Sequence, residues 1–184
     1  MHRALLLPGL LLLAFTPDQR DRPRDHLLWP EHPTLAWSDF KGDPGTLPEG
    51  FAAITHTEIS ASYATDASGV RTHVECWFVP TLSPVSRTGR TSTMLLQHEQ
   101  GHFDLTEVYA RKLRQAFADA KLTRADAAQR VAALADSVTR ALDARQDMYD
   151  QGTHYGRDEA EQAAWSTRIG RELDGLAAWA VKDR

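Results

Sequence analysis

The hydrophobic pattern of this chain changes period once, near residue 91, and that change limits the folds open to it. Over residues 70–79 apolar and polar side chains alternate, as they do in a strand with one buried face. Beyond residue 91 apolar side chains recur at helical spacing in three long stretches, at about 92–122, 123–149 and 157–181. Strands followed by a run of helices predict an α+β domain.

The strand-forming part of the sequence predicts a small antiparallel sheet. Residues 51–63 are rich in Thr, Ile and Ala, and residues 66–69 read Asp-Ala-Ser-Gly, which is typical of a tight turn. In 70–79 we expect the even-numbered residues on the buried face, and we expect this strand at an edge where an extended peptide could add to the sheet. Residues 35–40, which end in a Pro- and Gly-containing turn, predict a further strand or a docking segment.

The N-terminal residues have a different character from the rest. Met1-His2-Arg3 is a short basic start, and residues 4–15 are almost wholly apolar. Such a run is too short to span a bilayer, which needs about 20 apolar residues, but it is typical of a secretory signal peptide. We predict a signal peptide at 1–16, with an uncleaved anchor as the alternative.

The organisation that follows is a linker and one domain. Residues 17–34 are rich in Pro, Arg, Asp and His and predict an exposed linker, and residues 35–184 predict the folded domain. The predicted location is secreted or periplasmic, without stable membrane insertion after cleavage of the signal.

Composition excludes several functions. The 184 residues are enough for one domain with a core, and the net charge of −4 gives no basic footprint for nucleic acid. Cys76 is the only cysteine, so neither a disulfide within the chain nor a CxxC metal or redox site can form. Any metal must therefore be held by histidines and carboxylates.

One motif carries recognisable chemistry. His98, Glu99 and His102 form HExxH, and on a helix the two histidines lie one turn apart on the same face, where both can bind one metal ion. Glu99 lies beside that face and can take a proton from a water at the metal. Imidazole ligands without thiolates favour zinc, with one coordination position left open.

The helical wheel gives a separate test of this motif. At about 100° per residue, the two histidines share a side with apolar residues, so they are expected to face the interior. The apolar side contains Leu95, Leu105, Tyr109, Leu113 and Ala116; the opposite side contains Gln97, Gln100, Asp104, Glu107, Arg111 and Gln115. Gly101 inside this helix costs about 1 kcal/mol relative to Ala, which suggests close packing against another backbone.

The motif and its surroundings resemble a known family. The stretch from Leu95 to Leu105, with HEQGHFD at its centre, is similar to a bacterial exported family known as domain of unknown function 922. Weaker matches occur in the expected order at 37–42, 52–55 and 149–165. Members of that family are regarded as zinc-dependent proteases of zincin type, so the resemblance implies a zincin-like fold and a peptidase site. The family's Thr-x-His-Gly element differs here, because 153–156 read Thr-His-Tyr-Gly.

The remaining parts of such a site are less clearly marked. Catalytic zinc commonly takes three protein ligands, and Asp150, after the second helix and inside a family-like segment, is the first candidate for the third. His154 is the alternative, because a short loop containing glycine could deliver its imidazole. Tyr149 or Tyr155 could donate a hydrogen bond to the oxyanion that forms when water attacks a carbonyl. Asp104 is expected to make a supporting contact.

These observations predict a zinc-dependent metalloprotease that hydrolyses peptide bonds in the cell envelope or outside the cell. The predicted architecture is a zincin-like α+β fold with a small antiparallel sheet, an HExxH helix and two further helices. Its predicted cofactor is Zn²⁺, held by His98, His102 and Asp150, with Glu99 as the catalytic base and a protein or peptide as substrate. Two alternatives are a non-catalytic envelope protein stapled by zinc and a helical interaction protein without metal.

Overall fold

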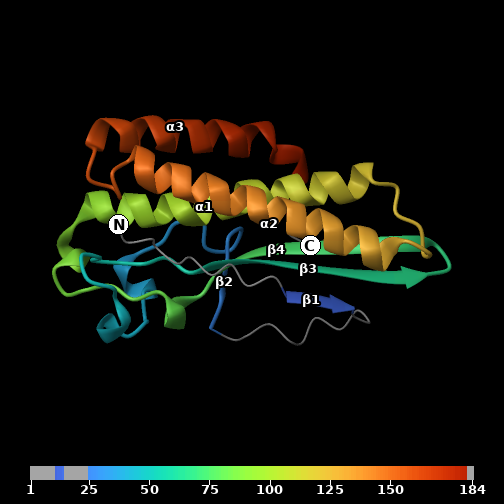
Figure 1. The fold of residues 1–184 in the computed structure, drawn as a ribbon, viewed down its shortest axis with the longest axis horizontal. Coiled ribbons are helices and arrows are strands. Elements are labelled where there is room, and N and C mark those ends of the chain that lie inside the picture. The colour runs from blue at the N-terminus through green and yellow to red at the C-terminus, as the bar shows by residue number, and fades with distance from the viewer. Residues whose placement is uncertain (1–10, 15–24, 182–184) are drawn as a thin grey trace.

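Three long helices lie on one side of a small sheet in the computed structural model, which describes residues 11–14 and 25–181 (Figure 1). The strands are β1 (Leu11–Ala14), β2 (Leu27–Leu28), β3 (Thr57–Asp66) and β4 (Gly69–Phe78), and the helices are α1 (Thr93–Asp119), α2 (Ala127–Gly152) and α3 (Glu159–Gly175). The predicted α+β class is confirmed. Most of the predicted signal peptide and the range 17–24 lie outside the described residues.

The β3–β4 hairpin forms around the predicted turn. Asp66 lies opposite Gly69, the Asp66 carboxylate accepts the Ser68 N–H at 2.7 Å, and Gly69 has a φ of +127° that favours glycine. Val74, Cys76 and Phe78 are buried as predicted, but the alternation fails at both ends of the strand, where Thr72 is exposed and Trp77 is buried. The first strand begins at Thr57 and not at residue 51, because Ala53 and Ile54 pair instead with the segment at 84–85.

Two short strands complete the sheet in the order β1-β3-β4-β2. The prediction that β4 is an edge strand is wrong at its C-terminal end, because β2 pairs antiparallel with Trp77 and Phe78. The predicted exposed linker is also wrong over β2, where Leu28 is buried. On the other side, β1 runs parallel to β3, so the sheet is antiparallel only across β3, β4 and β2.

Local hydrogen bonds set the helix ends. The Ser92 side chain caps α1 by accepting the Leu95 N–H, and Asp158 caps α3 by accepting the Glu161 N–H. The second helix begins at Ala127 and not at Thr123, because Asp126 accepts the Thr123 N–H in a separate turn. The third helix ends at Gly175, short of the predicted residue 181, and a 3₁₀ turn follows.

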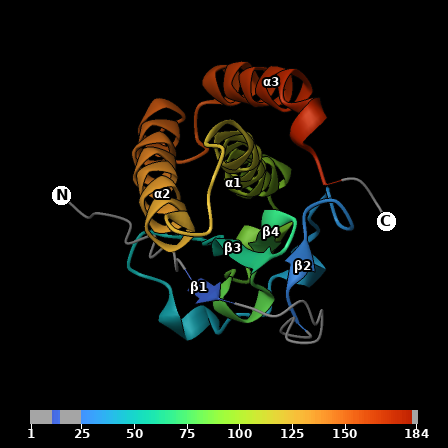
Figure 2. The same cartoon turned by 90° about the vertical axis from the view of Figure 1, so that its right-hand side faces the viewer.

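The core lies between the sheet and α1, which runs over the sheet with α2 at its side and α3 packed on its far side (Figure 2). Phe78 on β4 contacts both Phe40 and Phe103, so a loop, a strand and α1 meet there. Residues 37–39 form a 3₁₀ turn and not a strand, and the adjacent Leu35 and Phe40 are buried, so this region is a docking segment.

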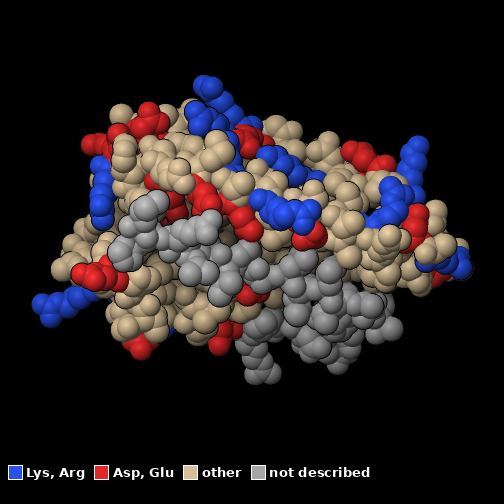
Figure 3. Space-filling model, in the orientation of Figure 1, with Lys and Arg blue, Asp and Glu red and all other residues tan. Residues whose placement is uncertain are grey.

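The surface view shows positive and negative side chains interspersed over the helices on the face drawn in Figure 3. Among the described residues, no helix combines the length and apolar character needed to cross a membrane.

Candidate metal centre

Helix α1 brings the two motif histidines together inside the protein. His98 and His102 are 3% and 5% exposed, and their Nε2 atoms lie 3.2 Å apart. Their helical spacing puts both rings on the face that α2 and α3 cover, at the end of the molecule where α1 begins and α2 ends (Figure 1). The prediction that the pair faces the interior is confirmed.

Asp150 joins the pair from α2. Its Oδ1 atom lies 3.2 Å from His98 Nε2 and 3.0 Å from His102 Nε2, and the side chain is buried. It lies in the last turn of α2 and not in a break after the helix, because α2 continues to Gly152. These three residues form a cluster that could hold a metal ion.

The three ligand atoms lie slightly closer together than the ligands of a tetrahedral zinc ion do. They form a triangle with sides of 3.0 to 3.2 Å. Zinc bonds of about 2.0–2.1 Å in a tetrahedron imply ligand–ligand distances of about 3.3–3.4 Å, so small shifts would fit the ion. Two imidazoles and a carboxylate are also a donor set that zinc accepts.

Charge interactions within the cluster oppose the effect of burial. Burial lowers the pKa of His102, but the charges of Asp150 and Glu99 and hydrogen bonds to Asp150 and Gln146 together raise that pKa to about 9. Burial likewise favours a neutral Asp150, yet His102 and His98 hold the pKa of this carboxyl well below its usual range. Asp150 therefore stays ionised and provides negative charge where a cation would bind.

Glu99 is buried beside the cluster with an unused oxygen. The side chain is 3% exposed, and among the described residues no group donates a hydrogen bond to its buried Oε2 atom. Glu99 directly follows His98 in α1, and its charge contributes to raising the pKa of His102 and of Tyr149. An unpartnered buried carboxylate oxygen is costly, so it indicates a missing water, ion or substrate group.

Three buried polar residues that the sequence analysis missed surround the histidine rings. Gln146 Oε1 lies 2.8 Å from His102 Nδ1, Gln162 Oε1 lies 3.2 Å from His98 Nδ1, and Thr153 Oγ1 lies 3.4 Å from the same atom. A signal for Gln146 was present: it falls between Leu142 and Tyr149 in the apolar stripe of α2, one turn before Asp150. A polar residue in an apolar stripe needs a partner.

Position 101 has room only for glycine. The neighbour that fills the space is the Tyr149 side chain and not the backbone segment that we predicted. A Cβ atom at this position would lie 2.1 Å from the Tyr149 hydroxyl oxygen. That hydroxyl donates to the His98 carbonyl at 3.1 Å and accepts from Gln162 Nε2 at 2.7 Å. Tyr149 is fully buried with its hydroxyl bonded inside the core, and its oxyanion role stays a prediction.

The conformation of the loop between α2 and α3 decides between Asp150 and His154 as the candidate third ligand. His154, Tyr155 and Gly156 all have positive φ values, and a Cβ atom on Gly156 would lie 2.6 Å from His98 Cβ. This tight turn directs His154 outward, where its side chain is 74% exposed and 3.8 Å from Asp158. His154 is therefore outside the cluster. Tyr155 is 38% exposed and contacts Phe51, and its oxyanion role stays a prediction.

Other charged residues that the sequence placed on the polar side of α1 have structural partners. Asp104 accepts hydrogen bonds from Trp29 Nε1 and Gln100 Nε2, both at 2.8 Å, so its supporting role fits. Glu107 and Arg111 are buried and paired, contrary to the wheel, because Arg111 donates to the Leu173 carbonyl at the end of α3.

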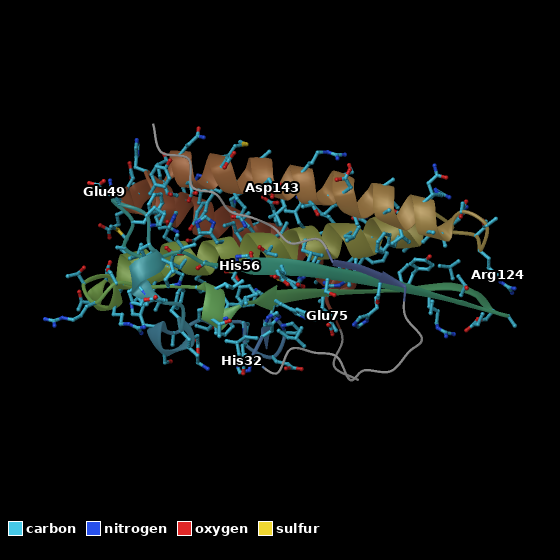
Figure 4. All side chains as sticks on the ribbon, turned by 60° about the horizontal axis from the view of Figure 1, so that its bottom comes forward. His32, Glu49, His56, Glu75, Arg124 and Asp143 are labelled. Atoms are coloured by element: carbon cyan, nitrogen blue, oxygen red, sulfur yellow. The ribbon has the colours of Figure 1, made fainter. Side chains whose placement is uncertain are left out.

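The remaining histidines that the structure describes lie apart from this cluster. His56, just before β3, pairs with Glu58, and His73 on β4 pairs with Glu75. Figure 4 labels His56 at the start of β3, and Arg124 in the α1–α2 connection at the opposite end of the molecule from Glu49.

Comparison with protein families gives one match. Residues 83–156 match a family described as a bacterial protein of unknown function (DUF922). The match supports the family resemblance of the sequence, and it contains His98, Glu99, His102 and Asp150 although it spans less than half of the chain. Comparisons with curated proteins and with solved structures gave no match.

Proposed function

We propose that this protein is a zinc-dependent metallopeptidase with a zincin-like site, acting in the cell envelope or outside the cell. The observation that carries the proposal is the buried triangle of His98, His102 and Asp150 ligand atoms beside the unpartnered Glu99 carboxylate oxygen. A triangle of protein ligands leaves the fourth position of a tetrahedron free for a reactant. The family match supports the location of the site but names no activity.

Each residue has a distinct part in the proposed reaction. His98, His102 and Asp150 hold the ion, which when bound supplies Lewis acidity that polarises a peptide carbonyl and acidifies water. Glu99 takes the proton from the water that attacks the carbonyl carbon. The same carboxyl then gives that proton to the amine nitrogen as the C–N bond breaks, so Glu99 returns to its ionised form.

The test compares two variants of the purified protein with a mixture of unstructured peptides. Glu99→Gln keeps the size of the side chain but removes the base, so we expect full zinc binding and a loss of cleavage of about 10²–10⁴-fold. Asp104→Asn is the control, because Asp104 lies on the same helix outside the cluster. Stoichiometric zinc without any cleavage that depends on Glu99 would contradict a peptidase.

A second candidate function is a non-catalytic envelope module in which zinc staples the helices. The observation in its favour is that the ligands come from both α1 and α2, so the ion would cross-link them. This candidate predicts that Glu99→Gln changes nothing measurable while His98→Ala lowers the stability of the zinc-loaded protein to that of the metal-free protein. The effect of Glu99→Gln on peptide cleavage therefore distinguishes the two candidate functions.

A further inference from the structure

We infer that Gln146 and Gln162 are positioning residues that fix both histidine ligands with the proton on Nδ1 and the Nε2 lone pair toward the metal position. The inference rests on the proposed metal centre and adds two residues that the motif does not contain. Both glutamines are buried, at 4% and 2% exposure, and each contacts one histidine ring. Ligand histidines commonly need such partners, because an unheld ring can rotate or change tautomer.

The orientation of the Gln146 amide follows from atoms that can only accept. Its Nε2 atom lies 3.1 Å from the His102 carbonyl oxygen, which has no proton to donate. The amide nitrogen must therefore face that carbonyl, with Thr106 Oγ1 as a further neighbour at 3.3 Å, and the amide oxygen must face the ring. An oxygen 2.8 Å from His102 Nδ1 requires the proton to be on Nδ1.

The orientation of the Gln162 amide follows in the same way, with Tyr149 as the intermediate residue. The Tyr149 hydroxyl must donate to the His98 carbonyl oxygen, so its lone pair accepts from Gln162 Nε2. The Gln162 oxygen then faces His98 Nδ1. Thr153 agrees with this assignment, because its hydroxyl donates to the Tyr149 carbonyl and offers only a lone pair to the ring.

Each set of hydrogen bonds links the ring of one histidine to the backbone carbonyl of the same histidine. Gln146 contacts the ring and the carbonyl of His102, and Gln162 with Tyr149 contacts the ring and the carbonyl of His98. Each ring is thereby held relative to its own backbone. Because both acceptors are neutral amides, Asp150 and Glu99 remain the nearby carboxylates that offset the charge of the ion.

The experiment measures zinc affinity by competition with a chelator and histidine tautomers by ¹⁵N NMR of the zinc-loaded protein. Gln146→Met and Gln162→Met keep the length of the side chain but remove the acceptor. We expect each to weaken zinc binding by about 10- to 100-fold, and Gln146→Met more strongly because its ring contact is shorter. In the unchanged protein we expect NMR signals for a protonated Nδ1 and a metal-bound Nε2 on both histidines.

Gln100→Met is the matched control. Gln100 also holds a network, from Leu35 N and Pro33 O to Asp104, but it makes no hydrogen bond to a ligand residue. It should lower thermal stability while zinc affinity stays within about threefold, well below the loss that removal of a ligand's partner causes. Gln162→Glu keeps an acceptor beside His98 Nδ1 but removes the Nε2 donor to Tyr149, so it should bind zinc more tightly than Gln162→Met.

The outcomes separate this inference from the proposed function. Absence of zinc binding in the unchanged protein would refute the metal centre itself. Normal binding together with methionine variants that behave like Gln100→Met, or with Nε2-protonated tautomers, would overturn the role of the glutamines alone. A Gln162→Glu variant as weak as Gln162→Met would overturn the role of the Gln162 acceptor.

Discussion

Replacing Gly101 with alanine tests the packing of the metal helix against Tyr149. Alanine improves helix propensity by about 1 kcal/mol. Against that gain, the new Cβ would lie 2.1 Å from the hydroxyl oxygen and 2.6 Å from Cζ of a fully buried ring. Relief requires the ring to move, at a cost of about 1–3 kcal/mol for overpacking. It also breaks two buried hydrogen bonds worth about 1 kcal/mol each.

We therefore expect Gly101→Ala to lower the free energy of unfolding by about 2–4 kcal/mol, measured by urea denaturation of the metal-free protein. Gly170→Ala in α3 is the control, because a Cβ there meets no atom within 4 Å, and the same substitution should stabilise by about 0.5–1 kcal/mol. Combining Gly101→Ala with Tyr149→Phe should recover part of the loss. Equal stability of the Gly101→Ala and Gly170→Ala variants would show that Tyr149 does not restrict position 101.

Two further predictions concern ligand choice and the buried ion pairs. Asp150→Asn should weaken zinc binding by about 100-fold or more, whereas His154→Ala should leave zinc affinity unchanged. Titration with a zinc chelator measures both affinities, and a larger loss in His154→Ala than in Asp150→Asn would contradict this choice of ligand. Glu107→Gln should cost about 3 kcal/mol in urea denaturation, because it leaves the buried Arg111 and the partly buried Arg114 without their carboxylate. Asp136→Asn, which removes the exposed partner of Arg140, should leave stability unchanged, so equal losses would contradict this account.

Local patterns predicted the parts of the fold that local physics decides. The alternation in 70–79 and the Asp-Ala-Ser-Gly turn specified the β3–β4 hairpin, since the side-chain period and a left-handed glycine act over a few residues. The short pairings of β2 and β1 depend on contacts with distant residues, and two to four apolar residues give no periodic signal. The helices were found, but their ends shifted by several residues because turns such as that at Asp126 compete for the same groups.

The candidate site was predictable where ligands share one helix and less so where they come from different helices. His98 and His102 are neighbours on α1 by spacing alone. Asp150 and His154 could be separated only by the path of the chain, because three consecutive left-handed residues direct His154 outward. Glu107 and Arg111 appeared exposed on the wheel because a wheel cannot show that the end of α3 covers that side of α1. Gln162 lies on another helix and required the tertiary structure.

The central claim is that His98, His102 and Asp150 bind one zinc ion and leave a coordination position open. Crystals of protein purified without chelators, with anomalous diffraction measured on both sides of the zinc absorption edge, test it most directly. We expect one zinc peak bonded to the two Nε2 atoms and the Asp150 carboxylate, with solvent as the remaining ligand. A zinc peak elsewhere, none at all, or a fourth protein side chain closing the site would contradict it.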